Sequence, residues 1–133
     1  MKSPRYDLLD SDRARITEEY VFKTTVKGYS AEWDEPGEQC ELRSYGLLII
    51  KPGFVYDFAS GAIDTPDMVV ASLAHDALCR LTDRGLIPWE ARAKSDKYFR
   101  QLLKQLGTPF FRRWYAYLAV RAYSVTLAKK RRA

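Results

Sequence analysis

Prolines and glycines divide the second half of the chain into three segments, and this punctuation restricts the fold more than any other feature. The first segment, about 65–81, opens with a threonine and a proline, which suit an N-cap and the first helical position, and stops near Gly85. The second runs from a proline to a glycine over about 88–106, and the third covers about 110–128. The pattern predicts three helices, the first two forming an antiparallel hairpin.

The first half, about 1–62, is typical of β-strands and loops. The stretch 19–29 is rich in β-branched and aromatic residues and ends near a glycine. The stretch 33–46 contains a Pro-Gly turn signal and is predicted to be a loop, whereas 47–60 contains two short extended pieces around another Pro-Gly. We therefore predict an α+β fold, with a small N-terminal antiparallel β-sheet followed by a three-helix C-terminal half.

With 133 residues the chain has room for a single domain, 1–133, which ends in a basic tail over 129–133. The net charge is +5, and the cations are concentrated near the C-terminus. This concentration predicts contact with an anionic neighbour such as nucleic acid, lipid headgroups or an acidic protein face, although a solvated tail would also explain it. The tail residues are Lys129, Lys130, Arg131 and Arg132.

Several classes of protein do not fit the sequence. Two cysteines do not make a disulfide framework, and no CxxC or Cys/His spacing suggests zinc. The first residues show no apolar region typical of a signal peptide. The longest apolar stretch, 114–128, is interrupted by Arg121 and is too short and too charged for a transmembrane segment. We expect synthesis in a reducing cytoplasm.

The only histidine, His75, stands in the first helical segment, while Asp96 falls on the apolar stripe of the second. A carboxylate there is costly unless it is paired, hydrogen-bonded or bound to a metal. His75 precedes Gly85 by ten residues and Asp96 follows it by eleven, so the two stand at nearly the same height. We predict that Asp96 fixes the tautomer of His75 and leaves the other ring nitrogen as a base. Alternatively, the pair only satisfies a buried helix crossing.

Oxygen ligands gather just before and within the first helical segment. Asp57 precedes Ser60 and Gly61, small residues that let the backbone approach a ligand. Asp76 is turned by about 100° from His75 around the helix and can face that segment. Asp57, Asp76, loop carbonyls and waters would suit Ca²⁺ or Mg²⁺. Alternatively, Asp57 caps a turn.

Four spaced motifs, "PGFVYDFAS", "AHDALC", "SDKYF" and "WYAYLAVRAY", resemble a family of unknown function found in tailed bacteriophages and prophages. The resemblance covers roughly 45–123 and implies a phage origin but no established activity. The residues that match its pattern are Pro52, Gly53, Phe54, Asp57, Ala59, Ser60, His75, Asp76, Asp96 and Phe99.

More distantly, the His-Asp pair and the aspartate on the next helix are similar to those of prokaryotic phospholipase A2. This resemblance implies that His75 activates water and that Asp96 orients it. It also implies that Asp57 and Asp76 bind Ca²⁺. The chain departs from that family in having Cys79 where a tyrosine is expected, and it lacks the family's disulfides.

These observations favour a small phage-type, metal-dependent hydrolase that acts on an ester, plausibly a lipid, and is used in penetrating or lysing the host. The alternative is a non-catalytic virion protein, a tail or connector component, whose aromatic third helix and basic tail dock on another virion protein or on DNA. In either case we expect the protein in the host cytoplasm and then in the virion. A weaker third hypothesis is a membrane-surface protein using the same helix, but a helix apolar nearly all round is more often buried.

Overall fold

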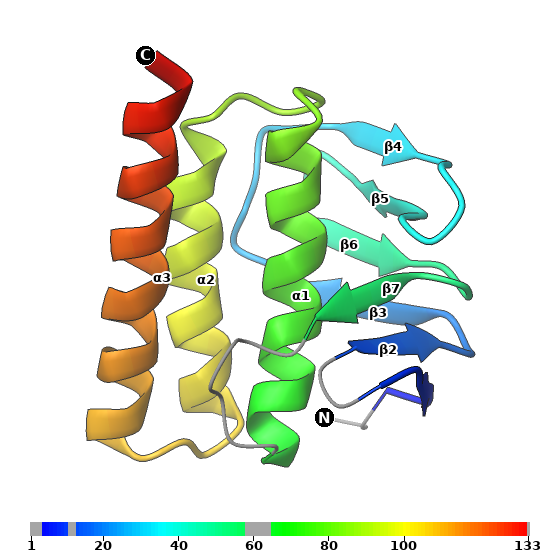
Figure 1. The fold of residues 1–133 in the computed structure, drawn as a ribbon, viewed down its shortest axis with the longest axis horizontal. Helices are drawn as coiled ribbons and strands as arrows, with labels where there is room; N and C mark the ends of the chain where they lie inside the picture. The colour runs from blue at the N-terminus through cyan, green and yellow to red at the C-terminus, as the bar shows by residue number, and fades with distance from the viewer. Residues whose placement is uncertain (1–3, 11–12, 58–64, 133) are drawn as a thin grey trace.

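The computed structural model describes residues 4–10, 13–57 and 65–132, with the side chains of 57, 131 and 132 left aside. In these ranges, strands form the first half and helices the second, which confirms the α+β class (Figure 1). The strands are β1 (Tyr6–Leu8), β2 (Arg13–Ile16), β3 (Tyr20–Lys23), β4 (Ala31–Trp33), β5 (Cys40–Leu42), β6 (Leu47–Ile50) and β7 (Val55–Asp57). The helices are α1 (Pro66–Asp83), α2 (Ala91–Gln105) and α3 (Phe110–Arg132).

The strands form two antiparallel sheets, with the orders β1-β2-β7 and β3-β6-β5-β4. The prediction of a loop over 33–46 was wrong for β5, which pairs with both β4 and β6. A turn closed by the Glu38 amide and the Glu35 carbonyl, 2.9 Å apart, reverses the chain after β4. Cys40 and Leu42 then point into the core while Glu41 points outward. Three residues of this alternation suffice for a strand because neighbouring strands supply its hydrogen bonds.

Helix α1 lies between the sheets and α2, and α3 packs on the far side of α2 at the outer edge of the molecule (Figure 1). The core joins the sheets to α1 and α2 through fully or almost fully buried apolar side chains, among them Phe22, Phe54, Leu73, Leu78 and Phe99. Burial of this apolar surface holds α1 in place. One face of α1 therefore meets the strands and another meets α2.

The hairpin between α1 and α2 turns where the sequence predicts it. Gly85 has φ 72°, and the amide of Leu86 donates to the Leu81 carbonyl at 3.0 Å, as in a Schellman cap. Two details differ at the helix starts. Thr65 is the N-cap of α1, but its hydroxyl makes no capping bond and accepts one from Arg112 instead. Helix α2 begins at Ala91, three residues after its proline, because the intervening residues form a tighter turn.

Helix α3 differs from the prediction in length and in burial. It continues to Arg132, so most of the expected basic tail is helical, which suits residues of good helix propensity and cations near a helix C-terminus. It is also covered on one side only: Phe111, Tyr115 and Leu118 are exposed. The expectation that an all-round apolar helix is buried was wrong here. In the described part of the chain, no helix is long and apolar enough to cross a membrane.

Candidate metal and acid–base site

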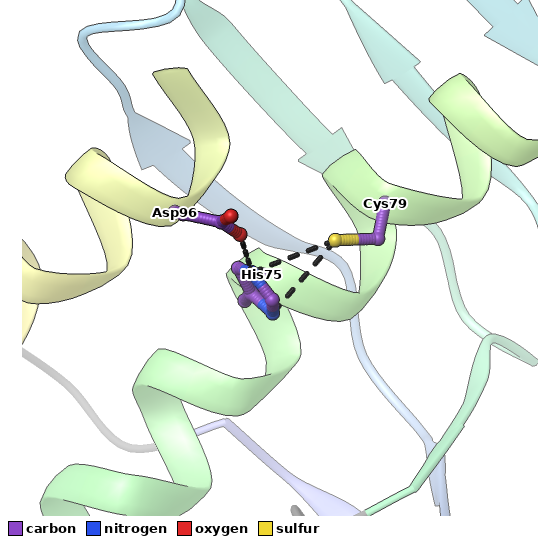
Figure 2. A group of neighbouring side chains, drawn as sticks. All are labelled: His75, Cys79 and Asp96. Atoms are coloured by element: carbon purple, nitrogen blue, oxygen red, sulfur yellow. Dashed lines mark hydrogen bonds and ion pairs between the residues drawn. The ribbon is translucent and has the colours of Figure 1, made fainter. Parts of the chain in front are cut away.

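The predicted contact between His75 and Asp96 is confirmed. Nε2 of His75 on α1 lies 2.5 Å from Oδ1 of Asp96 on α2 (Figure 2). The antiparallel hairpin brings the two helices together at this height, and the ring of Phe99, 4.9 Å away between centroids, packs against the imidazole. The Asp96 side chain is fully buried, whereas His75 keeps 16% of its side chain exposed. The histidine is therefore the member of the pair that solvent can reach.

A second pair of donors occupies the other oxygen of Asp96. Nη1 of Arg121 lies 2.9 Å from Oδ2, and the hydroxyl of Ser124 donates to the same atom at 2.8 Å. Both residues belong to α3, so all three helices meet at this carboxylate. Arg92, itself buried, donates from Nε to the Ser124 hydroxyl at 3.2 Å and pairs with Asp83. A buried carboxylate that accepts from a cation, an imidazole and a hydroxyl meets the requirement that buried charge be compensated.

Cys79 completes the group, with its sulfur beside the nitrogens of the His75 ring and near the Asp96 carboxylate (Figure 2). It stands one helical turn after His75 on α1, so the two side chains share a face of the helix. Its Sγ lies 3.5 Å from Nε2 and 3.8 Å from Nδ1 of His75. One ligand atom from each of His75, Cys79 and Asp96 falls within 4.8 Å of the others, so the three could hold a metal ion.

The charge state of His75 follows from these neighbours. Burial by itself lowers the pKa of the ring, but the Cys79 sulfur and the Asp96 carboxylate outweigh that effect, and the pKa of His75 is raised. Below the raised pKa the ring carries a proton on each nitrogen and forms an ion pair with Asp96. A metal ion bound to the ring would have to displace one of these protons, so its affinity would rise with pH.

The predicted calcium ligands are only partly described. The side chain of Asp57 and the residues Ser60 and Gly61 lie outside the described part of the chain. Asp76 is on α1, where its Oδ2 accepts from Nη2 of Arg80 at 3.0 Å. Arg80 is fixed by a second bond to the Gly37 carbonyl. A guanidinium at this distance opposes a divalent cation on Asp76 by like-charge repulsion.

The residues of the predicted anion contact lie at the end of α3. Lys129 and Lys130 are exposed, whereas the side chains of Arg131 and Arg132 lie outside the described set. Nearby, a cavity of about 290 Å³ opens between α2 and α3. Its lining includes Arg92, Arg121 and Ser124, which join the network around Asp96, but neither His75 nor Cys79. The cavity and the exposed edge of the histidine are therefore on different sides of the buried carboxylate.

Three members of the site, Cys79, Arg121 and Ser124, were not predicted from the sequence. Cys79 was identified only as a departure from a family pattern, although its spacing of four residues from His75 on a helix places the two on one face. Arg121 stands out in the sequence only because it interrupts an apolar stretch, and no pattern distinguishes Ser124. Polar side chains such as Arg121 and Ser124 in an otherwise apolar helix indicate that each has a buried polar partner. The sequence does not identify that partner.

A family model described as "Protein of unknown function (DUF1353)" matches residues 36–120, which contain His75, Cys79 and Asp96. The expectation that the chain resembles a family of unknown function is thus confirmed, whereas the match carries no link to phages or to phospholipase A2. No curated protein and no solved structure matches the chain.

Proposed function

The chain belongs to the DUF1353 family, whose function is unknown, and from its site we propose that it is a metal-dependent hydrolase whose metal is held by His75, Cys79 and Asp96. The observation that carries this proposal is the convergence of an imidazole, a thiol and a carboxylate within 4.8 Å where two helices meet. Nitrogen and sulfur ligands select transition metals, Zn²⁺ above all, whereas Ca²⁺ takes oxygen ligands.

The separations support a tetrahedral site. Zinc bonds of about 2.0 Å to nitrogen and about 2.3 Å to sulfur place those two atoms roughly 3.5 Å apart at tetrahedral angles. The Cys79 sulfur lies 3.5 Å and 3.8 Å from the two ring nitrogens of His75, which agrees with this spacing. The Asp96 carboxylate lies closer to the ring than the sulfur does, and it would move away from Nε2 when a metal ion replaces the hydrogen bond between them. Zinc bonds of about 2.0 Å to both atoms would require Nε2 of His75 and Oδ1 of Asp96, which are 2.5 Å apart, to separate to roughly 3.3 Å.

Three protein ligands distinguish a catalytic from a structural zinc site. Structural zinc is usually closed by four protein ligands, whereas catalytic zinc keeps one position for water and lowers the pKa of that water to about 7. His75 is the partly exposed ligand, so the open position would lie on its solvent side. Arg121 and Ser124, bound to the far oxygen of Asp96, would fix the orientation of this ligand.

The proposed substrate class rests on a family resemblance. The arrangement of His75 against Asp96 agrees with the resemblance to prokaryotic phospholipase A2, and on that basis we propose a carboxylic ester, plausibly of a lipid, as the substrate. A role in phage infection or host lysis is part of the same proposal. Calcium on Asp57 and Asp76 remains the metal that the resemblance implies, but the ion pair between Asp76 and Arg80 favours the zinc ligands instead.

The test is ester hydrolysis by metal-stripped protein reloaded with Zn²⁺ or Ca²⁺. Soluble nitrophenyl esters and phosphatidylcholine would be the substrates. We expect activity with Zn²⁺ that is lost in Cys79→Ala and kept in Cys40→Ala, a matched loss of a buried thiol away from the site. Activity that requires Ca²⁺ and is lost in Asp76→Asn would overturn the zinc assignment. Absence of hydrolysis with either metal, in protein that melts normally, would overturn the hydrolase.

A further inference from the structure

The outer face of α3 exposes a continuous row of apolar side chains. Phe111 is 84% exposed, Tyr115 79% and Leu118 60%, and Val125 continues the row at 44%. Together with Ala122 these residues are spaced by four and three positions, which places them along one side of the helix. Large apolar side chains gathered in this way on a surface usually mark an interaction site.

The same helix has an unusual charge. Its sequence contains seven Lys and Arg residues and no Asp or Glu, so it carries more positive charge than the net +5 of the whole chain. Arg112 and Arg121 contact carboxylates on α1 and α2. Lys129 and Lys130 are exposed at the C-terminal end of the helix, next to the last apolar residues of the row. The surface thus combines apolar side chains with positive charge.

The positive charge of α3 argues against a second copy of the chain as the partner that covers this apolar row. Two α3 helices packed along their apolar rows would place cations against cations at the helix ends, whether parallel or antiparallel. Neither helix offers a carboxylate to compensate them. Like charges across an interface cost free energy and suppress pairing. The occupant must therefore be anionic and able to accept apolar side chains.

We propose that α3 lies on the surface of an anionic lipid bilayer. Phe111, Tyr115 and Leu118 would enter the boundary between headgroups and acyl chains, while Lys129 and Lys130 would contact lipid phosphates. A helix with aromatic and aliphatic residues on one face and cations beside them is suited to this position. Helix α3 stands at the outer edge of the molecule, with α2 behind it, so no other element in the described part of the chain blocks the approach (Figure 1). This inference does not depend on the proposed hydrolase.

Flotation with lipid vesicles tests whether α3 binds an anionic bilayer. Binding to vesicles of phosphatidylcholine with phosphatidylglycerol is compared with binding to phosphatidylcholine alone. We expect binding to the anionic vesicles that is at least about tenfold stronger and that weakens as salt is added, because the cations of α3 attract the anionic headgroups and salt screens this attraction. Lys129→Glu with Lys130→Glu should reduce the affinity by at least about tenfold.

The apolar row has a matched control. Phe111→Ser with Leu118→Ser should lower the affinity by at least about tenfold, whereas Leu8→Ser with Tyr45→Ser, exposed apolar residues on the strands and their loops, should leave it unchanged. All four side chains are exposed, so folding should survive and melting curves would verify it. No binding, equal binding to both vesicles, or equal loss in both double variants would overturn the proposal. So would a dimer in sedimentation that Phe111→Ser with Leu118→Ser dissociates.

Discussion

Replacement of Asp96 by asparagine should destabilise the protein more than any other change of a single side-chain atom at this site. The carboxylate is fully buried and holds His75 at 2.5 Å and Arg121 at 2.9 Å. An asparagine side chain would keep the volume but leave the positive charges of both partners without compensation. Breaking a buried ion pair in this way typically costs 3–5 kcal/mol, so we expect a loss of about 3–5 kcal/mol in the free energy of unfolding.

Urea denaturation measures this loss directly. For a domain of this size the transition midpoint should fall by at least about 1 M, with little change in slope. The control is Glu18→Gln, which breaks a pair with Arg5 in which both side chains are more than half exposed, and should cost below about 1 kcal/mol. If Asp96→Asn lies within about 1 kcal/mol of the wild type, the account of Asp96 as a buried charge that three helices share would be refuted.

Three further changes test other parts of the structure. Ser124→Ala removes a donor to Asp96 and the acceptor of Arg92, so urea denaturation should show a loss of about 1–3 kcal/mol. Gly46→Ala places a Cβ atom against the Thr24 carbonyl oxygen, closer than a van der Waals contact, and should cost more than about 1 kcal/mol beyond the cost of Gly28→Ala, where φ is similar and the space is open. The hydrogen bond from Arg84 lowers the pKa of Glu38. The stability that this carboxylate contributes is therefore present above the unfolded pKa of about 4.3 and is lost as the pH falls through the lowered pKa. A pH series of melting curves should show the melting temperature of Glu38→Gln approaching that of the wild type in acid.

The contact between His75 and Asp96 could be predicted because it depends on regular geometry. Both residues stand on uninterrupted helices, and Gly85 marks the turn, so the rise per residue fixes their relative height. The inward position of Asp96 also follows from the apolar stripe around it. Local rules of this kind also predicted the three helices and the strands β3, β6 and β7, but not β1, β2, β4 or β5.

The other partners of Asp96 could not be predicted in the same way. Arg121 and Ser124 reach it because α3 packs against α2 at a particular height and rotation, which tertiary packing decides. The spacing of apolar residues in α3 does not indicate which face is buried, because apolar residues lie on nearly all sides of the helix. Its exposed face was therefore not predicted. The strand β5 was not predicted for a related reason. Its three residues are too few to show a clear alternation of apolar and polar side chains, and the strand forms because it pairs with its neighbours β4 and β6.

Cobalt binding tests whether His75, Cys79 and Asp96 hold a metal ion. Co²⁺ takes the place of Zn²⁺ in such sites, and its absorption in the near ultraviolet and visible reports a thiolate ligand and a tetrahedral geometry. We expect one bound Co²⁺ per chain with both features, and we expect the thiolate band to be absent in Cys79→Ala and unchanged in Cys40→Ala. Zn²⁺ should displace it and raise the melting temperature. Absence of a thiolate band in the wild type, or its persistence in Cys79→Ala, would contradict a metal site formed by His75, Cys79 and Asp96.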